Sequence, residues 1–249
     1  MRINKTGFKS IHKISSKETL ATYNAWISWL SDQKKYSNNT IASYSYDYKY
    51  FLNFLTFHLS TNKISLKDIG NLSLRDFRSW LSFLGSLKPD IKAKSLARAR
   101  SSLKSFFFFC INKKKIKSTE INKLTNPKLP KNLPRALSEK KILEILTLID
   151  KEKNEVVKTR NKVLVLLFWG CGLRVSEALA LDKSEINSDF LVILGKGKKE
   201  RIIPLLPLVK NSLLEWLTIR EKISNIKSAA VFIGQAGKRL TPRSVQKFM

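Results

Sequence analysis

The 249-residue chain carries 47 Lys and Arg against 19 Asp and Glu, a formal net charge of +28 at pH 7, and 43% of its residues are hydrophobic. That hydrophobic content suffices for one or two ordinary cores and excludes a disordered polycation. The charge exceeds what solubility requires, so nucleic acid is the expected partner. Two alternatives could account for the excess positive charge. One is a lysine-rich proteome encoded by an AT-rich genome, and the other, with less support, is binding to a membrane surface.

The positive charge is spread along the chain. Residues 1–126 carry 23 basic and 7 acidic side chains, and residues 127–249 carry 24 and 12. This distribution predicts two folded parts that both face DNA or RNA, and it argues against a single basic tail.

Cysteine usage and hydropathy indicate an intracellular setting. Cys110 and Cys171 lack the paired spacing of a disulfide or a metal site. The longest apolar run, which starts at residue 163, is too short to span a bilayer, and the basic N-terminus has no apolar signal-peptide region. We therefore expect a cytoplasmic protein with no membrane partner.

Apolar residues at helical spacing predict four helices in the first half, over residues 20–30, 41–59, 74–84 and 93–111. The segment Asn38-Asn39-Thr40 is typical of a helix N-cap. The fourth helix has an apolar side and a cationic side that can lie in a DNA groove, although a merely solvated basic face is the alternative. The cationic side consists of Lys94, Arg98 and Lys104.

A basic, proline-containing segment separates the two halves. Residues 112–141 hold ten basic and two acidic side chains, with helix-breaking prolines at 127, 130 and 134. We place a helical domain at 1–125, a linker that can follow a phosphate backbone at 126–137, and a second domain at 138–249.

The second half mixes helices with two strands. Helices are expected over residues 138–149, 159–169, 174–181 and 208–222, and a further helix begins at the sequence Thr241-Pro242-Arg243-Ser244. Residues 190–194 and 200–205 have strand character and are joined by Gly195-Lys196-Gly197-Lys198-Lys199, which predicts a β-hairpin with lysine at its tip. The fold class is therefore mainly α with a small β-sheet.

Arg174, Glu177 and Lys196 are the residues most suited to chemistry. An arginine at a helix start after a glycine turn can donate two parallel hydrogen bonds to a phosphate and stabilise a pentacoordinate transition state. Glu177, one turn later, can orient that guanidinium, and a lysine on a hairpin can protonate a leaving oxygen. The spacing alone also fits a surface salt bridge and an exposed turn.

Other chemistries lack support. The glycines around Lys196 do not form a P-loop, and the two histidines, His12 and His58, suggest neither a zinc site nor a Cys-His pair. Carboxylates are too scattered for a two-metal nuclease. We expect no cofactor and no metal.

An ordered set of motifs resembles one family over almost the whole chain. Gly172-Leu173-Arg174-Val175-Ser176-Glu177, followed by the hairpin from Gly195 to Leu205, is similar to the first catalytic box and the catalytic hairpin of tyrosine recombinases, the Xer type in particular. Stretches at 39–44, 95–106, 126–138 and 240–245 resemble the core-binding domain, the linker and later landmarks of that family.

The resemblance implies an N-terminal helical core-binding (SAM-like) domain and a mixed α/β catalytic domain that clamp double-stranded DNA. By position, Arg174 matches the first catalytic arginine of the family, Glu177 its supporting acidic residue and Lys196 its catalytic lysine. Thr40 and Arg243 join Lys94, Arg98 and Lys104 as expected DNA contacts. The family reaction uses neither metal nor nucleotide, and four protomers, often with a paralogous partner, exchange strands between two sites in chromosome dimer resolution.

The chain departs from the family pattern at its end. The His-x-x-Arg box and the nucleophilic tyrosine of the family should follow Val245, but no histidine lies beyond His58 and no tyrosine beyond Tyr50. We therefore expect a truncated catalytic domain that binds duplex DNA without cutting it. A non-catalytic or regulatory DNA-binding relative is the alternative, and a general RNA-binding protein is a weaker third.

Overall fold

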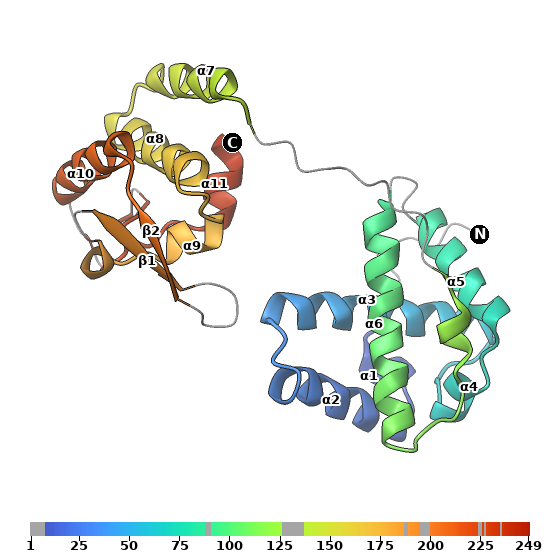
Figure 1. The fold of residues 1–249 in the computed structure, drawn as a ribbon. Helices are drawn as coiled ribbons and strands as arrows, with labels where there is room; N and C mark the ends of the chain where they lie inside the picture. The colour runs from blue at the N-terminus through green and yellow to red at the C-terminus, as the bar shows by residue number, and fades with distance from the viewer. Residues whose placement is uncertain are drawn as a thin grey trace. The chain divides into compact units, whose positions relative to one another are not determined.

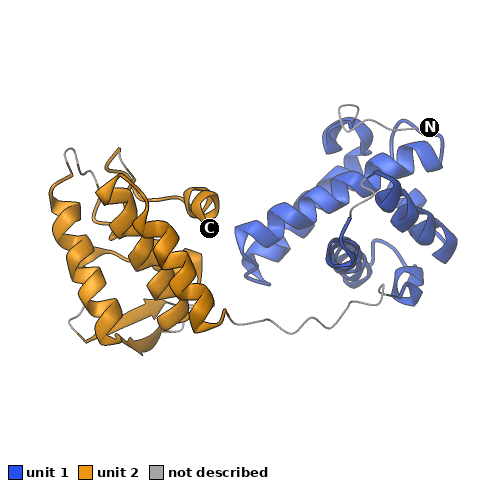
Figure 2. Cartoon of the chain, turned by 90° about the horizontal axis from the view of Figure 1, so that it is seen from above, with its two compact units in different colours: residues 1–132 blue, residues 133–249 orange. Residues whose placement is uncertain are grey.

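The computed structural model describes residues 8–87, 91–125, 137–186, 189–194, 200–223, 226, 228–234 and 236–249. The chain divides into two compact units, residues 1–132 and 133–249 (Figure 2). Apart from Leu137, the predicted linker at 126–137 lies outside the described residues.

The named secondary-structure elements in the described part of the first unit are all helices. Its longest helices, α3 and α6, cross and pack on each other (Figure 1). The elements in chain order are α1 (Ile11–Ile14), α2 (Lys17–Asp32), α3 (Asn38–His58), α4 (Leu66–Gly70), α5 (Leu74–Leu87), α6 (Ala93–Asn112) and the 3-10 helix η2 (Glu120–Lys123).

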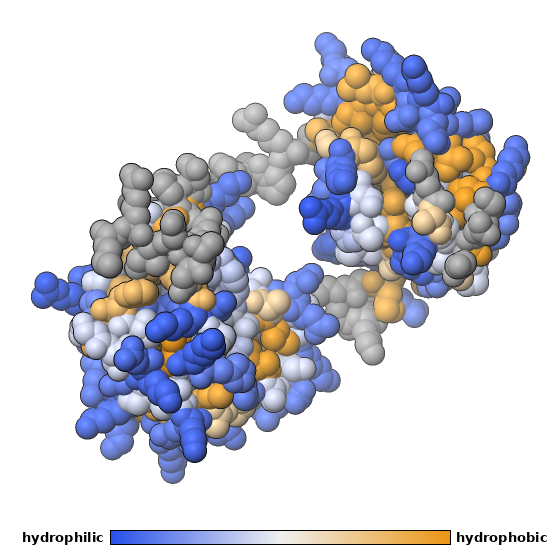
Figure 3. Space-filling model, turned by 180° about the vertical axis from the view of Figure 1, so that it is seen from behind, coloured by the Kyte–Doolittle hydropathy of each residue, from blue (hydrophilic) through white to orange (hydrophobic). Residues whose placement is uncertain are grey.

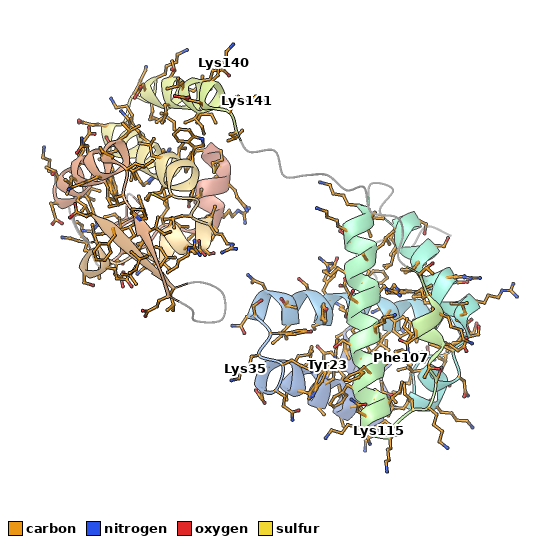
Figure 4. All side chains as sticks on the ribbon, viewed as in Figure 1. Tyr23, Lys35, Phe107, Lys115, Lys140 and Lys141 are labelled. Carbon is orange, nitrogen blue, oxygen red and sulfur yellow. The ribbon has the colours of Figure 1, made fainter. Side chains whose placement is uncertain are left out.

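Aromatic side chains from α2, α3 and α6 form the core of this unit. The rings of Trp26 and Tyr48 lie 5.4 and 4.6 Å from that of Phe106, and all three side chains are buried. Figure 4 shows Tyr23 and Phe107 among the side chains at this crossing. Such rings bury large apolar areas in preferred geometries, so these contacts stabilise the packing of α2 and α3 on α6.

The second unit places α8 between two other helices, with α7 and α10 packed against it (Figure 1). Its elements are α7 (Glu139–Asp150), α8 (Glu155–Gly170), α9 (Val175–Ala180), the 3-10 helix η3 (Lys183–Glu185), β1 (Phe190–Leu194), β2 (Glu200–Pro204), α10 (Pro207–Glu221) and α11 (Pro242–Phe248).

The two strands form an antiparallel hairpin in which Phe190 pairs with Pro204 and Leu194 with Glu200. Leu191 and Ile193 are buried on one face of β1, as the two-residue period of a strand requires. On β2 the same period turns Arg201 and Ile203 inward. A polar side chain on an inward face needs a partner, and that partner belongs to the candidate site.

The prediction of a mainly helical chain with a small sheet is confirmed. The predicted N-cap at 38–40 is wrong by one position, because the cap of α3 is Ser37, whose hydroxyl accepts from the Thr40 backbone N–H at 3.3 Å. Ser37 begins a run of four residues that can all cap a helix, so composition alone could not choose among them.

Candidate functional site

A tight turn leads from α8 into α9. Gly172 has φ +61°, in the left-handed region that glycine adopts without strain. The N–H of Leu173 returns to the Leu167 carbonyl at 3.3 Å, and the Leu173 side chain is buried. Arg174 then takes an extended conformation as the N-cap of α9, and its side chain is 67% exposed. The turn therefore anchors the chain on the core and presents the next residue, an arginine, to solvent.

Glu177 is the centre of the site. Its buried carboxylate accepts the Arg174 backbone N–H at 2.8 Å and the Arg174 Nη1 at 2.8 Å. It also accepts two parallel hydrogen bonds from Arg201 Nη1 and Nη2, at 3.1 and 2.9 Å. One carboxylate is thus shared by two guanidinium groups, and the cluster keeps a net charge of +1.

These hydrogen bonds fix the ionisation of Glu177. Those from Arg201, ahead of those from Arg174, lower the pKa of Glu177 from 4.5 to about 2, against the opposing effect of burial. A carboxylate that accepts several charge-assisted hydrogen bonds stays ionised at neutral pH. Glu177 is therefore suited to holding arginines in place and unsuited to donating a proton.

The far end of α9 is fixed by Arg239. Its Nη1 donates to the carbonyls of Leu179 and Ala180 at 2.7 and 2.9 Å, and its Nη2 pairs with Asp182. A guanidinium at the last carbonyls of a helix satisfies acceptors that the helix itself leaves open. Arg239 therefore holds the C-terminal end of this short helix, while the Glu177 carboxylate, which accepts the Arg174 backbone N–H, holds its start.

The predicted residues Arg174 and Glu177 are brought together by the structure. Their catalytic roles remain predictions. Lys196 lies in 195–199, outside the described residues, although the pairing of Leu194 with Glu200 brings the two ends of that segment side by side.

Sequence reasoning missed Arg201 as the second partner of Glu177. The available signal was the strand period, which puts Arg201 on the same face of β2 as Ile203. An arginine on an inward face implies a nearby carboxylate. The sequence could not say which one, because the partner is far away in the chain.

The predicted DNA contacts of the first unit differ in their surroundings. Lys94 is exposed on α6, whereas Arg98 donates two hydrogen bonds, both 2.9 Å, to the carboxylate of Asp47. Lys104 is half-buried, and burial together with Arg100 lowers its pKa. Thr40 is half-buried in the first turn of α3, where its hydroxyl lies 2.9 Å from that of Ser37.

In the second unit, the predicted contact Arg243 is exposed in the first turn of α11. Within the described ranges, no cluster of three or more His, Cys, Asp or Glu is arranged to hold a metal ion. The helices of that same part of the chain are all too short or too polar to cross a membrane.

Two family models match the chain. The N-terminal SAM-like domain of phage integrases matches residues 23–114, and the phage integrase family matches residues 135–249. The tyrosine recombinase XerC of Rickettsia conorii is 36% identical over 225 residues, which cover 89% of this chain and 72% of that protein. The XerC of Rickettsia felis is 36% identical over 220 residues, which cover 87% and 70%.

Solved structures share the fold. XerH bound to its difH substrate in a pre-cleavage complex gives a TM-score of 0.63 at 21% identity, with 96% of this chain and 72% of that one covered. Lambda integrase (residues 75–356) bound to DNA gives 0.66 at 16% identity, with 96% and 76% covered. The chain belongs to the tyrosine recombinase (phage integrase) family, as the motif resemblance predicted.

Proposed function

We propose that this chain binds duplex DNA through both units and acts in site-specific recombination, with Arg174 as a phosphate-gripping residue. The single observation that carries the proposal is the Arg174–Glu177–Arg201 cluster. It holds an arginine two-thirds exposed, with one face fixed by a carboxylate, and it keeps a net positive charge. A guanidinium held in this way can bind two non-bridging phosphate oxygens.

The relatives support the same substrate. Those at 36% identity are named tyrosine recombinase XerC, and the XerH and lambda integrase structures contain DNA. One lambda integrase structure is a tetramer bound to a Holliday junction. For this chain we propose duplex DNA as the partner, and assembly with further recombinase protomers, a paralogue among them, on that DNA in the cytoplasm.

The remaining predicted contacts take roles in this proposal. Lys196 would protonate the leaving oxygen, as its match to the family lysine implies. Thr40, Lys94, Arg98, Lys104 and Arg243 would contact the DNA backbone, where cations and hydroxyl groups bind phosphates.

A non-catalytic, DNA-binding role is the second candidate, and the tyrosines favour it. All six tyrosines belong to the first unit, and Tyr48 and Tyr50 are buried there. Burial raises the pKa of Tyr44 and Tyr48, and raises that of Tyr50 to about 12. An attacking phenolate needs the opposite shift. Incubation with a nicked suicide DNA substrate separates the candidates, because a covalent adduct attached to one of these tyrosines would exclude the non-catalytic role.

Salt-dependent binding tests the phosphate grip. Duplex affinity is measured by fluorescence anisotropy at several salt concentrations for the wild type, Arg174→Ala and Arg174→Lys. Loss of one phosphate contact reduces the slope of log K against log salt by about 0.9. We expect this smaller slope for Arg174→Ala. We expect Arg174→Lys to keep the wild-type slope but to bind DNA more weakly, since lysine lacks the planar guanidinium that can donate two parallel hydrogen bonds to a phosphate.

Lys222→Ala is the matched control, because it removes one positive charge from an exposed position just after α10. Equal slopes for Arg174→Ala and Lys222→Ala would mean that Arg174 contributes only general charge. The proposed role of Arg174 would then be wrong.

A further inference from the structure

The first unit contains a small cavity between α3, the C-terminal end of α5 and the first turns of α6. Its volume is about 310 Å³. Small-molecule sites range over about 300–1,000 Å³, so this cavity suits a ligand of roughly the size of one nucleotide. In Figure 3 the first unit, at the lower left, shows hydrophobic side chains set between hydrophilic ones. The lining of the cavity combines the same two kinds of group.

One part of the lining is apolar. It is formed by Leu84 and Leu87 of α5, by Ile91 and by Ala99 of α6. Tyr46 of α3 also lines the cavity and is 43% exposed. An exposed aromatic ring near an apolar surface can stack on a planar, uncharged ring of a ligand, as in sites that bind unpaired bases.

The rest of the lining is polar, and Tyr50 is its buried hydrogen-bond donor. The Tyr50 hydroxyl oxygen accepts a hydrogen bond from the Tyr46 hydroxyl at 2.6 Å. The hydrogen of the Tyr50 hydroxyl has no acceptor among the described residues. Burial raises the pKa of Tyr50 to about 12, so this hydrogen is retained at neutral pH. A buried donor without an acceptor is costly, and the hydroxyl is therefore suited to a ligand that accepts a hydrogen bond.

The charged side chains of the lining favour an anion. Arg98 donates from Nε and Nη2 to the Asp47 carboxylate, at 2.9 Å each, and its Nη1 has no partner among the described residues. Lys92 is exposed at the N-cap of α6. Among the described residues of the lining, Asp47 is the only acidic one and Lys92 and Arg98 are the basic ones, so their charges sum to +1.

The start of α6 favours the same charge. The N-cap residue Lys92 gives no side-chain hydrogen bond to this 20-residue helix. The N-terminal end of a helix carries a partial positive charge, and its open backbone N–H groups bind phosphates. Ser95, in the first turn, lines the cavity and adds a hydroxyl group. A phosphate has several oxygens that can accept hydrogen bonds from such donors together.

We propose that this cavity binds one nucleotide, with the base against Tyr46 and the apolar lining and the phosphate on Arg98 and Lys92. The Tyr50 hydroxyl donates to an acceptor atom of the ligand. Two sources can supply this chemistry, namely a free mononucleotide and an unpaired nucleotide that has left the base stack of a DNA strand. The second source rests on the DNA binding proposed above.

Isothermal titration calorimetry of the full chain, freed of nucleic acid, tests the site with deoxyadenosine monophosphate. We expect Kd on the order of 100 µM. Deoxyadenosine lacks the phosphate and inorganic phosphate lacks the base, so each should bind at least about tenfold more weakly. Equal binding of inorganic phosphate and the nucleotide would mean that the chain attracts any anion through its net charge of +28, and the proposal would be wrong.

Two variants of the lining have matched controls outside it. Tyr50→Phe removes the hydroxyl but keeps the ring, and Lys92→Ala removes a cation, so each should raise Kd about threefold to tenfold. Tyr36→Phe and Lys113→Ala are the controls, because both residues are exposed and neither lines the cavity. We expect the controls to change Kd by less than about twofold. Equal effects within either pair would contradict the site, and circular dichroism checks that all four variants fold.

A duplex with one extra, unpaired adenosine nucleotide separates the two sources. Fluorescence anisotropy compares it with a fully paired duplex. Tighter binding of the interrupted duplex, lost in Tyr50→Phe, would assign the site to a nucleotide of DNA. Equal binding of the two duplexes, together with nucleotide binding in calorimetry, would assign it to a free nucleotide.

The same measurements distinguish failure of this inference from failure of the proposed function. A chain that binds the paired duplex, but binds no nucleotide in calorimetry and shows no preference for the interrupted duplex, would overturn the nucleotide site and leave the proposed function in place. A chain that binds deoxyadenosine monophosphate but neither duplex would support the site and contradict the proposed DNA binding.

Discussion

Arg174 and Arg201 donate to the same oxygen atom, Oε1 of Glu177, at 2.8 and 3.1 Å. One arginine begins a helix and the other lies on a strand, so the shared carboxylate ties α9 to the hairpin. The side chains of the two arginines are 67% and 38% exposed, whereas that of Glu177 is 6% exposed. The carboxylate is therefore a buried anchor, and the exposed charge of the cluster is entirely positive.

Replacing the anchor should cost stability in a pH-dependent way. Glu177→Gln removes the charge that both guanidinium groups bind, and we expect a loss of about 1–3 kcal/mol at pH 7. Because the folded-state pKa of Glu177 is depressed to about 2, this contribution is present above the ordinary pKa of 4.5 and is lost as pH falls towards 2.

Urea unfolding of the wild type and Glu177→Gln across pH 2 to 7 checks the expectation. Other carboxyl groups cancel in the difference between the two proteins. The gap in unfolding free energy should shrink below about pH 4.5. A gap that is the same at all pH values would show that Glu177 acts through packing and not through its charge.

Arg201 should matter to DNA binding without touching DNA. In Arg201→Ala the single negative charge of Glu177 is left to neutralise Arg174 alone, so the net charge of the cluster falls from +1 to 0. We expect weaker duplex binding and a smaller salt slope than in the wild type. The measurement is the same anisotropy titration, with Lys222→Ala as the control for general charge.

A double variant separates charge from positioning at this cluster. Arg201→Ala with Glu177→Gln returns the net charge to +1 but leaves Arg174 without its carboxylate partner. We expect the double variant to regain the wild-type salt slope but only part of the wild-type affinity. Without its carboxylate partner, the Arg174 guanidinium is no longer held in the orientation that binds phosphate. If the double variant binds no better than Arg201→Ala, the charge argument fails.

Two cations one helical turn apart on α6 should behave differently. Lys94→Ala should reduce DNA affinity and the salt slope while changing stability by less than about 0.5 kcal/mol, because Lys94 is exposed. Arg98→Ala should also destabilise the fold by about 1–3 kcal/mol, because it removes two hydrogen bonds from Asp47, whose side chain is 6% exposed.

Thermal and urea unfolding give the stability of Lys94→Ala and Arg98→Ala, and the anisotropy titration gives their DNA affinity. The Asp47 carboxylate raises the pKa of Arg98, as an ion pair does, so the arginine stays charged in every condition of the assay. Unchanged stability in Arg98→Ala would mean that the Asp47 pair is not needed for folding. Arg98 would then act only as a DNA contact, as Lys94 does.

The sequence could predict features whose signal lies within a few neighbouring residues, but it could not predict which distant residues form ion pairs with each other. Helical periodicity located α3 and α6, and the glycine turn located Arg174 and Glu177, because each of these signals lies within a few residues. The partners Asp47 for Arg98 and Arg201 for Glu177 are set by tertiary packing, which spacing does not encode. The short helices α1 and α4 were missed for a related reason, since one turn of helix carries too little periodicity to detect.

Replacing glycine by alanine should have opposite effects on stability at Gly172, in the turn before α9, and at Gly85, inside α5. Gly172 has φ +61°, and a methyl group added there would meet no atom within 4 Å. Any cost of Gly172→Ala is therefore backbone strain, which we expect to be about 1–2 kcal/mol. Gly85, inside α5, also has open space around it but does not have a positive φ. Gly85→Ala should stabilise the chain by about 0.5–1 kcal/mol.

Urea unfolding of both variants gives the two signs directly. Gly172→Ala should also weaken DNA binding, because the strained turn can relax only by shifting Leu173 and Arg174, and the guanidinium would leave its place beside Glu177. Gly85→Ala should leave binding unchanged. If Gly172→Ala binds DNA like the wild type despite its lower stability, then the turn supports the fold alone, and the position of Arg174 depends on Glu177 and Arg201.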